Sequence, residues 1–582
     1  MSDRVASRGV AGLPVLAGRR LPNLWDGAAL LVVLGALIAI GHVAAGTLLP
    51  LAAPRALAVH LDPAWLPDYA VRTTLRMFAA LLASLTFTFT YATAAAKSRR
   101  AGLILIPILD ILQSVPILGF LSFTVVFFMN LFPGRVLGLE LAAIFAVFTS
   151  QAWNMAFSFY QALTTLPADL VEAAASFRLT PWQRFWRLEV PFATPGLVWN
   201  TMLSMSGGWF FVVAAEAISV GNTTWKLPGI GSYVALALER RDLAAVAFAI
   251  GTMLVVILAY DQLLFRPLVA WSARFRFETT AGATMGDPWM LRLMRRTLLL
   301  NRIGDAIGAT AAAIGGMRLA LPLRRAAAAR EGTPSRAVDA LWLAVLAVVL
   351  AWAGWKIQRF LGTELRWRDL FHVALLGLYT LARVLSVMLV ACAIWVPLGV
   401  WIGLRPAWAR RVQPVAQFLA AFPANLFFPV FVLAIVRFRL NTDVFLTPLM
   451  LLGTQWYVLF NVVAGAAAFP GDLREVAANF RVGGLLWWRR VILPGIFPYL
   501  VTGLITASGN AWNTAIVAEV ASWGNARLTA HGLGAYIAQA TERGDMARVM
   551  LGIVVMSGFV MLFNRLLWRP LYAYSTRRLT LG

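Results

Sequence analysis

Cysteine and histidine are scarce in this chain. One cysteine, Cys392, stands among 582 residues and lies inside an apolar run. A single thiol cannot form an intrachain disulfide, and no cysteine-based metal site can be built from it. The four histidines are scattered and form no ligand cluster. The sequence therefore favours neither a disulfide-stapled fold nor a metal centre.

A phosphate-binding loop is also missing, because no G-x-x-x-x-G-K-[ST] pattern occurs in the sequence. Loops of that type cradle the phosphates of ATP. We therefore expect that the chain does not hydrolyse ATP by itself and carries no cofactor of its own. A membrane enzyme would need carboxylates, histidines or cysteines gathered at one site, and the sequence shows no such cluster.

Charged residues are few, at 13%, whereas apolar residues make up 60% of the chain. With a mean hydropathy of +0.75, the chain has more apolar surface than a soluble domain can hide, so lipid must surround most of it. A spanning helix needs about 20 apolar residues, and about twelve such runs are present. The net charge of +24 comes from basic residues between the runs, which suits a membrane protein and gives no reason to expect nucleic acid as a partner.

Basic flanks orient the expected helices. Four arginines precede the first apolar run, and Lys97 to Arg100 follow the second. Such flanks stay in the cytoplasm, so the N-terminus is expected there, and the first run is too long for a signal peptide. Six spans are expected in the first half, at about 27–47, 73–96, 117–132, 138–162, 194–219 and 243–265.

A basic segment, residues 271–336, joins the two halves and is expected at the inner membrane surface. It contains the apolar-basic stretch 289–296, which suits a short interfacial helix; a regulatory or partner-docking segment is the alternative. The first repeat is placed at 1–270 and the second at 337–582, with both termini in the cytoplasm. Spans of the second half are expected at about 338–354, 376–403, 415–437, 444–463, 496–521 and 547–567.

The two halves are copies of one another. Over about 115 residues one offset of 303 positions relates them, whereas Arg76 to Pro116 matches Arg383 to Pro423 at 307. An internal repeat this regular means that the chain contains two copies of one structural unit. The residues that coincide at 303 positions include Trp153 with Trp456, Trp209 with Trp512, Glu216 with Glu519, and Arg266-Pro267 with Arg569-Pro570.

Each half also has a basic amphipathic segment between two apolar runs, Glu172 to Pro191 and Glu475 to Pro494. The pattern predicts a helix–turn–helix on the cytoplasmic side, which we call an elbow. Tryptophan and arginine are typical of the membrane interface, so a simple anchor is one interpretation. The other is a docking knob, which the twofold repetition favours, because two equivalent knobs imply a partner with two equivalent sockets.

The elbows resemble the EAA loop of binding-protein-dependent ABC importer permeases, whose pattern is E-A-A, three residues, G, nine residues, I-x-L-P. Both copies depart from it in having arginine in place of the glycine. Since glycine would allow the turn at no steric cost, the turn is expected to move to Thr180-Pro181 and to Gly483-Gly484. Positions that the resemblance implicates in ATPase coupling are Glu172, Ala173, Ala174, Arg178 and Pro191, and Glu475, Ala477, Ala478, Arg481 and Pro494.

The resemblance covers nearly all of both halves. A Trp-x-x-x-x-x-Ala-Glu stretch (209–216 and 512–519), followed by Gly-x-Gly-x-Tyr (229–233 and 532–536), is similar to the nitrate, taurine, sulfonate and bicarbonate branch of these permeases. It implies an all-α type I importer permease fold, with two parallel six-helix repeats fused in one chain and coupling loops at 165–193 and 468–496. It also implies a bacterial inner-membrane location.

The partners follow from the same resemblance. They are two copies of a cytoplasmic ABC ATPase, which would bind ATP and magnesium, and an extracytoplasmic substrate-binding protein. The expected solute is a small anion or sulfonate. The alternative is a secondary transporter driven by an ion gradient, whose repeats are often inverted; it would need no paired elbows.

Polar groups inside apolar runs need a partner or a purpose. Glu216 and Glu519 are candidates for the solute path, or else carboxylates hydrogen-bonded between helices. Tryptophan and asparagine at these spacings also hold helices together. The candidate path residues are Trp153, Asn154, Trp209, Glu216, Trp456, Trp512, Asn513 and Glu519.

Overall fold

The protein was analysed as a computed structural model, which describes residues 24–53, 57–113, 115–220, 223–275, 289–290, 297–318, parts of 344–359, 367–523 and 526–578. Helices dominate it, and nine of those within these ranges are long and apolar enough to cross a membrane. The all-α membrane fold predicted from the sequence is therefore confirmed.

The first half is built on α2 (Leu66–Phe87), α6 (Val136–Thr164), α9 (Val190–Glu216) and α11 (Leu243–Tyr260), preceded by the lipid-exposed α1 (Leu24–Thr47). Shorter elements connect them. These are η1 (Pro63–Trp65), η2 (Thr88–Ala92), α3 (Thr93–Lys97), α4 (Arg99–Leu112), α5 (Ile117–Leu131), α7 (Ala168–Ser176), α8 (Pro181–Arg184), η3 (Phe185–Glu189), α10 (Ile230–Glu239), η4 (Asp261–Phe265), α12 (Arg266–Ser272), η5 (Ala273–Phe275) and α14 (Leu298–Gly316).

The second half repeats this order. Its long helices are α17 (Trp367–Gly403), α21 (Thr447–Ala467), α24 (Leu493–Ala518) and α26 (Met546–Phe563). Its connecting elements are α18 (Pro406–Ala421), η6 (Ala424–Phe427), α19 (Phe428–Arg437), α20 (Thr442–Phe445), α22 (Gly471–Asn479), α23 (Gly484–Trp487), η7 (Trp488–Ile492), α25 (Leu533–Glu542), η8 (Asn564–Trp568) and α27 (Arg569–Arg578).

The predicted spans differ from the observed helices at two places in the part of the chain that the structure describes. The stretch 117–132 forms α5, which has only 15 residues. The stretch 415–437 bends by 80° between Ala421 and Ala424, because Pro423 disfavours helical geometry in the residue before it. The span predicted at 338–354 and the interfacial helix predicted at 289–296 lie largely outside the described residues.

The segments that follow α9 and α24 are also folded. Two antiparallel hairpins, β1 (Ala217–Val220) with β2 (Thr223–Lys226) and β3 (Val520–Trp523) with β4 (Ala526–Thr529), continue α9 and α24. After each hairpin a short helix, α10 or α25, packs back onto the bundle. The short segments between the fifth and sixth spans of each half therefore contain a hairpin and a largely buried helix.

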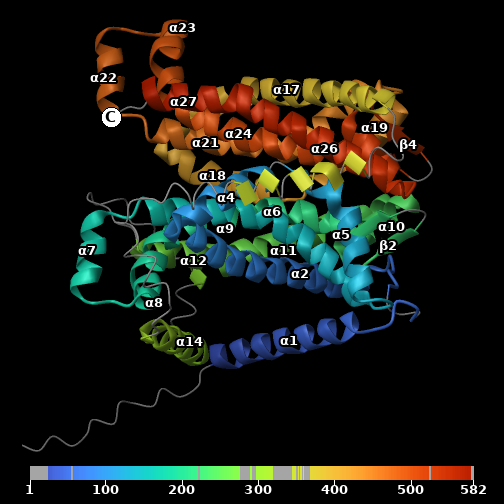
Figure 1. Ribbon diagram of the computed structural model, residues 1–582, viewed down its shortest axis with the longest axis horizontal. Helices are drawn as coiled ribbons and strands as arrows, with labels where there is room; N and C mark the ends of the chain where they lie inside the picture. The colour runs from blue at the N-terminus through green and yellow to red at the C-terminus, as the bar shows by residue number, and fades with distance from the viewer. Residues whose placement is uncertain are drawn as a thin grey trace, which may run out of the picture.

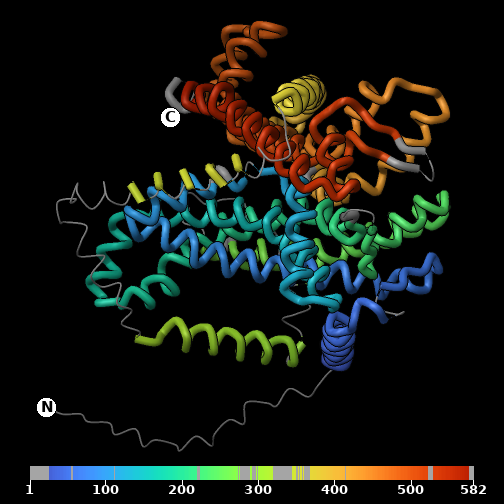
Figure 2. The backbone as a smooth tube through the Cα atoms, turned by 45° about the vertical axis from the view of Figure 1, so that its right-hand side comes forward, coloured from blue at the N-terminus to red at the C-terminus, as the bar shows by residue number. Residues whose placement is uncertain are grey.

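The two halves form two layers that exchange elements (Figure 1). Helix α5 of the first half packs on α24, α25 and α26 of the second, and α18 of the second packs on α9 and α11 of the first. Both elbows, α7–α8 and α22–α23, project at one end of the molecule, whereas β2, β4 and α10 lie at the other (Figure 1). A tube view shows the same layering, with α14 running beneath the first half (Figure 2).

Candidate coupling elbows and solute chambers

Each elbow turns at the arginine that replaces the pattern's glycine. Arg178 and Arg481 have φ angles of 52° and 51°, in the left-handed region. The amide of Arg178 donates to Ala175 O at 2.9 Å and that of Leu179 to Ala174 O at 3.2 Å, and the second elbow makes the same two bonds. These are the bonds of a Schellman ending, which stabilise a left-handed residue after a helix. The expectation that the turn moves to Thr180-Pro181 and Gly483-Gly484 is therefore wrong.

The residues after the turn start the second limb of the elbow. Thr180 caps α8, since its hydroxyl accepts from the Gln183 amide while the Gln183 side chain accepts from the Thr180 amide. Gly484 has a φ of +60° and opens α23 without such a cap. The first elbow is consequently the better fixed of the two at this point.

The elbow positions expected from the resemblance divide between an inner and an outer face. Ala174 and Ala477 are buried, and the two prolines begin the following long helices, half-buried. The outer face is exposed in both copies and holds Glu172, Ala173, Arg178, Glu475, Ala478 and Arg481.

Sequence reasoning missed one pair on this outer face. Phe177 and Phe480, which are 303 positions apart, each expose 79% of their surface. A large exposed aromatic on a rigid helix end is typical of a binding anchor. Its recurrence beside both arginines, as Phe-Arg, was the available signal.

Ion pairs between side chains attach the first elbow to the bundle. Glu189 is 3% exposed; its carboxylate lies 2.7 Å from Lys97 Nζ on α3 and 3.0 Å from Arg184 Nε on α8. The corresponding residues of the second half are Ile492, Leu404 and Trp487. The second elbow therefore rests on apolar packing, and Ile492 is fully buried there.

The linker adds a second difference between the elbows. Trp182 Nε1 donates to Ile314 O at 2.6 Å, and Gln183 Nε2 donates to Gly316 O at 2.9 Å, so the end of α14 packs beside α8 (Figure 1). At the other end of α14, Asp26 of α1 accepts from the Leu299 amide. The matching positions of the second elbow, Leu485 and Leu486, are exposed.

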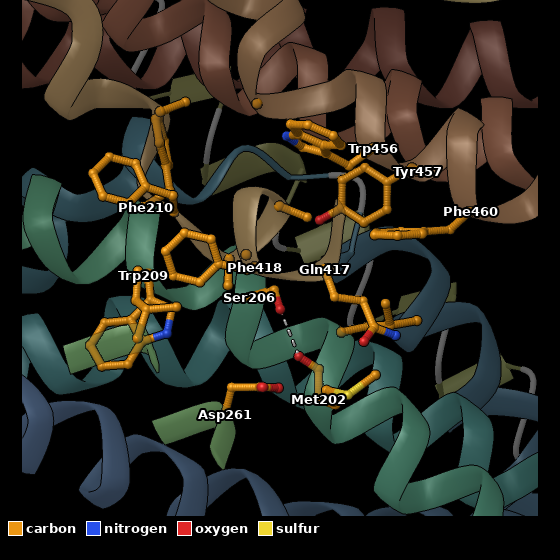
Figure 3. A pocket seen from close by; sticks show the side chains of 18 of the residues that line it. Met202, Ser206, Trp209, Phe210, Asp261, Gln417, Phe418, Trp456, Tyr457 and Phe460 are labelled. Carbon is orange, nitrogen blue, oxygen red and sulfur yellow. Dashed lines mark hydrogen bonds between the residues drawn. The ribbon is translucent and has the colours of Figure 1, made fainter. Parts of the chain in front are cut away.

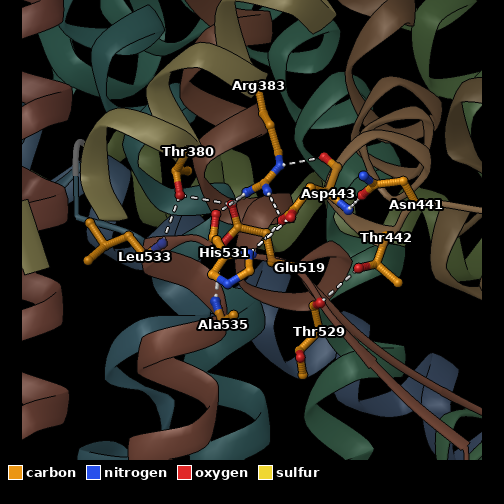
Figure 4. A network of polar contacts seen from close by, with 10 residues as sticks. All are labelled: Thr380, Arg383, Asn441, Thr442, Asp443, Glu519, Thr529, His531, Leu533 and Ala535. Carbon is orange, nitrogen blue, oxygen red and sulfur yellow. Dashed lines mark hydrogen bonds and ion pairs between the residues drawn. The ribbon is translucent and has the colours of Figure 1, made fainter. Parts of the chain in front are cut away.

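Two ion-pair clusters repeat at the hairpin end. Arg76 donates to Glu140 at 2.6 and 2.8 Å and to Glu216 at 2.6 Å, and all three side chains are buried. Arg383 pairs in the same way with Asp443 and Glu519, both at 2.9 Å (Figure 4). The sequence did not predict Arg76 and Arg383 as partners of Glu216 and Glu519, because they lie 140 and 136 positions away in the chain.

The glycines after each hairpin complete the clusters. The Gly231 amide donates to Glu216 Oε2 at 2.7 Å, and the Ala535 amide donates to Glu519 Oε2 at 3.1 Å. A Cβ on Gly229 or Gly532 would lie 2.2–2.4 Å from the carboxylate. Glu216 and Glu519 are thus carboxylates bonded between helices, which was one of the two interpretations of their sequence.

Two cavities lie between the halves and meet near the middle. The first, the aromatic chamber, has a volume of about 60 Å³, and Figure 3 shows its ring-rich walls. Its lining includes Met202, Leu203, Ser206, Gly207, Trp209, Phe210, Ile257, Asp261, Phe418, Leu452, Gly453, Trp456, Tyr457 and Asn510.

The second, the polar chamber, has a volume of about 180 Å³. Its lining includes Gln113, Ile117, Thr149, Ser150, Trp153, Asn154, Ser204, Gly207, Tyr457, Thr506, Gly509, Asn510, Trp512, Asn513, Val560 and Asn564. Of the candidate path residues, Trp153, Asn154, Trp512 and Asn513 line this chamber, and Trp209 and Trp456 line the other. The two glutamates are absent from the described linings of both.

Comparison with known proteins agrees with this architecture. The family model of "Binding-protein-dependent transport system inner membrane component" matches twice, at residues 84–265 and 395–580. The chain therefore belongs to that family and carries two of its permease domains, fused in tandem.

Individual relatives place it near one branch of the family. It is 26% identical over 186 residues to the bicarbonate transport system permease protein CmpB of Synechococcus elongatus, which is 32% of this chain and 64% of that protein. It is 27% identical over 187 residues to the nitrate import permease protein NrtB of Leptolyngbya laminosa, 32% and 63% of the two chains. The chain spans just under two thirds of the length of these two relatives.

Another relative is the glycine betaine/carnitine transport permease protein GbuB of Listeria monocytogenes. The two are 32% identical over 167 residues, which is 28% of this chain and 52% of that protein.

Proposed function

We propose that the chain is the transmembrane permease subunit of an ABC importer, powered by two ATPase subunits that dock on its two elbows. The observation that carries this proposal is the pairing of two elbows at one end of the molecule (Figure 1), each with an exposed glutamate, phenylalanine and arginine at matching positions. Two equal knobs fit a partner present in two copies. The chain's own lack of a phosphate loop fits a separate source of ATP hydrolysis.

The elbow end then faces the cytoplasm and the hairpin end receives the substrate-binding protein. Lys97, which opens the basic stretch 97–100, is ion-paired with Glu189 of the first elbow, so this stretch lies beside that elbow. The positive-inside rule places such basic stretches in the cytoplasm, which supports this orientation. The relatives named for bicarbonate and nitrate favour a small anion as the solute. An ion-gradient transporter is the competing function, and the exposed elbows would then be interfacial anchors only.

Native mass spectrometry of the purified chain, co-expressed with the ABC ATPase encoded beside it, tests the proposal. We expect one chain with two ATPase copies. A chain that never binds an ATPase, and whose uptake follows an imposed ion gradient, would overturn it.

A further inference from the structure

The two chambers are equivalent positions of the internal repeat. Met202 and Ile257 of the aromatic chamber correspond to Ile505 and Val560 of the polar chamber at the offset of 303. Trp456 corresponds to Trp153 at the same offset. Gly207, Asn510 and Tyr457 line both chambers, so these residues lie where the two cavities meet. A Cβ on Gly207 would lie 3.2 Å from the Tyr457 hydroxyl, which makes this junction narrow.

The linings of the two chambers differ in polarity. At three matched positions the polar chamber has hydrogen-bonding side chains where the aromatic chamber has apolar ones. The matched pairs are Thr506 with Leu203, Asn513 with Phe210, and Thr149 with Leu452. The reverse holds at two positions, where Ser206 and Tyr260 of the aromatic chamber match Gly509 and Phe563. The polar chamber still has the larger number of hydrogen-bonding side chains in its lining.

Three donors on residues that line the polar chamber, Trp512 Nε1, Trp568 Nε1 and Ser204 Oγ, have no partner in the part of the chain that the structure describes. Trp512 Nε1 belongs to a side chain that is 1% exposed, and Ser204 Oγ to one that is 3% exposed. Buried donors are nearly always hydrogen-bonded, so each unsatisfied one needs an explanation. An indole N–H can only donate. The missing partner of Trp512 is therefore an acceptor, such as the oxygen of a solute.

The electrostatic surroundings favour an acceptor with negative charge. The lining of the polar chamber, as far as its side chains are described, contains no Asp, Glu, Lys or Arg. Ile117, the first residue of α5, is in that lining, and its amide donates to Asn513 Oδ1 at 2.6 Å. A helix N-terminus carries partial positive charge. The aromatic chamber instead contains the Asp261 carboxylate, which is paired with Arg266.

From this lining we infer that a small oxyanion with a single charge binds in the polar chamber, held by neutral donors that include Trp512 Nε1 and Ser204 Oγ, and that the aromatic chamber does not admit it. Neutral donors bind an anion without the strong pairing that a buried cation would give, which suits a site that must also release its solute. This inference rests on the proposed function and specifies the site on which that function acts.

Cysteine labelling tests the inference on the full-length chain in liposomes, without any ATPase. In a Cys392→Ser background, Thr506→Cys and its counterpart Leu203→Cys would be exposed to anionic sulfonatoethyl and cationic trimethylammonioethyl methanethiosulfonate. Each labelling rate would be divided by the rate at which the same reagent reacts with a free thiol. We expect Thr506→Cys to react with the anionic reagent faster than Leu203→Cys by about tenfold, the lower end of what an electrostatically favourable site achieves.

Nitrate then serves as the oxyanion probe. We expect nitrate to slow the labelling of Thr506→Cys by the anionic reagent, and this protection to be lost in Trp512→Phe but kept in the matched Trp209→Phe. Should Thr506→Cys be poorly folded, Asn513→Cys with Phe210→Cys repeats the comparison.

Equal labelling of the two chambers, faster labelling of Thr506→Cys by the cationic reagent, or nitrate protection that survives Trp512→Phe would each overturn the inference. None of these results depends on ATPase binding. A chain that binds its ATPases but fails the labelling test refutes the solute site alone, whereas a chain that passes the labelling test but binds no ATPase refutes the proposed function.

Discussion

Arg76 Nη1 lies 2.6 Å from Glu216 Oε1, and this ion pair joins α2 to the end of α9 inside the protein. Arg383 and Glu519 repeat it at 2.9 Å between α17 and the residue after α24. The Thr73 and Thr380 hydroxyls donate to the same carboxylates and accept from the first amides of α10 and α25. Each cluster therefore fixes four elements at the hairpin end of its half.

Arg76→Met should destabilise the protein more than Arg383→Met. Removing one member of a fully buried ion pair leaves an uncompensated charge and typically costs about 3–5 kcal/mol. The partners of Arg76 are both buried, whereas the Asp443 side chain beside Arg383 is 38% exposed and can be rehydrated. Thermal unfolding in detergent would measure both variants, and equal midpoints for the two would contradict the difference in burial.

Gly231→Ala and Gly534→Ala should both unfold at lower temperature than the wild type. The added Cβ would lie 2.1 Å from Val213 O or 2.5 Å from Ala515 O, so α10 or α25 must move away from its glutamate. Gly251→Ala is the matched control, because that glycine lies within α11 with nothing within 4 Å. Alanine in a helix interior is better than glycine by about 0.5–1 kcal/mol, so the control should be neutral or more stable.

The double variant Arg178→Gly/Arg481→Gly separates the contribution of the left-handed turn from that of the arginine side chains. A left-handed conformation costs a non-glycine residue roughly 1–2 kcal/mol, so glycine should leave the fold as stable as before or more so. ATPase affinity should nonetheless fall, by about tenfold or about 1.4 kcal/mol, because the exposed guanidinium groups lie beside Phe177 and Phe480. Calorimetry of unfolding and a binding titration measure the two effects.

Alanine at the same two positions is the control for that pair of measurements. It should lose ATPase affinity to the same degree as the glycine variant but be less stable than that variant, since it keeps the left-handed strain and lacks the arginine side chain. Undiminished affinity in the glycine variant would show that Arg178 and Arg481 serve only the turn.

Glu189→Gln should weaken the attachment of the first elbow to the bundle, and the second elbow has no corresponding ion pair. Ion pairs with partly exposed partners are worth about 0.2–1 kcal/mol, and both partners of Glu189 are about one third exposed, so the loss should be of this size. Hydrogen exchange should show faster opening of α8 in this variant, while α23 stays unchanged. Ile492→Glu is the reciprocal test, and it should be strongly destabilising because Leu404 and Trp487 offer the new carboxylate no cation.

Local pattern was enough to predict the parts of the fold that depend on the membrane and on the repeat. Apolar runs predicted nine spans that the described residues contain, and the offset of 303 predicted matching elbows. The turn was misplaced because backbone hydrogen bonds outweigh the steric cost of a left-handed Arg178, and sequence alone does not show those bonds.

The site was predictable only in part, for a similar reason. Trp153, Asn154, Trp512 and Asn513 could be chosen from polarity and spacing, and the structure brings them into one chamber. The pairing of Arg76 with Glu140 and Glu216 spans 64 and 140 positions, and no local period reports on contacts so distant. The two chambers differ in the polarity of their linings. This difference could not be predicted, because each lining combines residues of both halves and the sequence does not show which of them face one another.

ATP hydrolysis coupled to uptake is the most direct test of the central claim that the elbows transmit the work of two ATPases. The complex would be reconstituted in liposomes with its binding protein, as wild type and as Glu172→Ala/Glu475→Ala and Phe177→Ala/Phe480→Ala double variants. We predict that the wild type hydrolyses ATP faster when the solute-loaded binding protein is added, and that both double variants lose ATPase binding or this stimulation while remaining folded. Wild-type stimulation and uptake in both double variants would contradict the account.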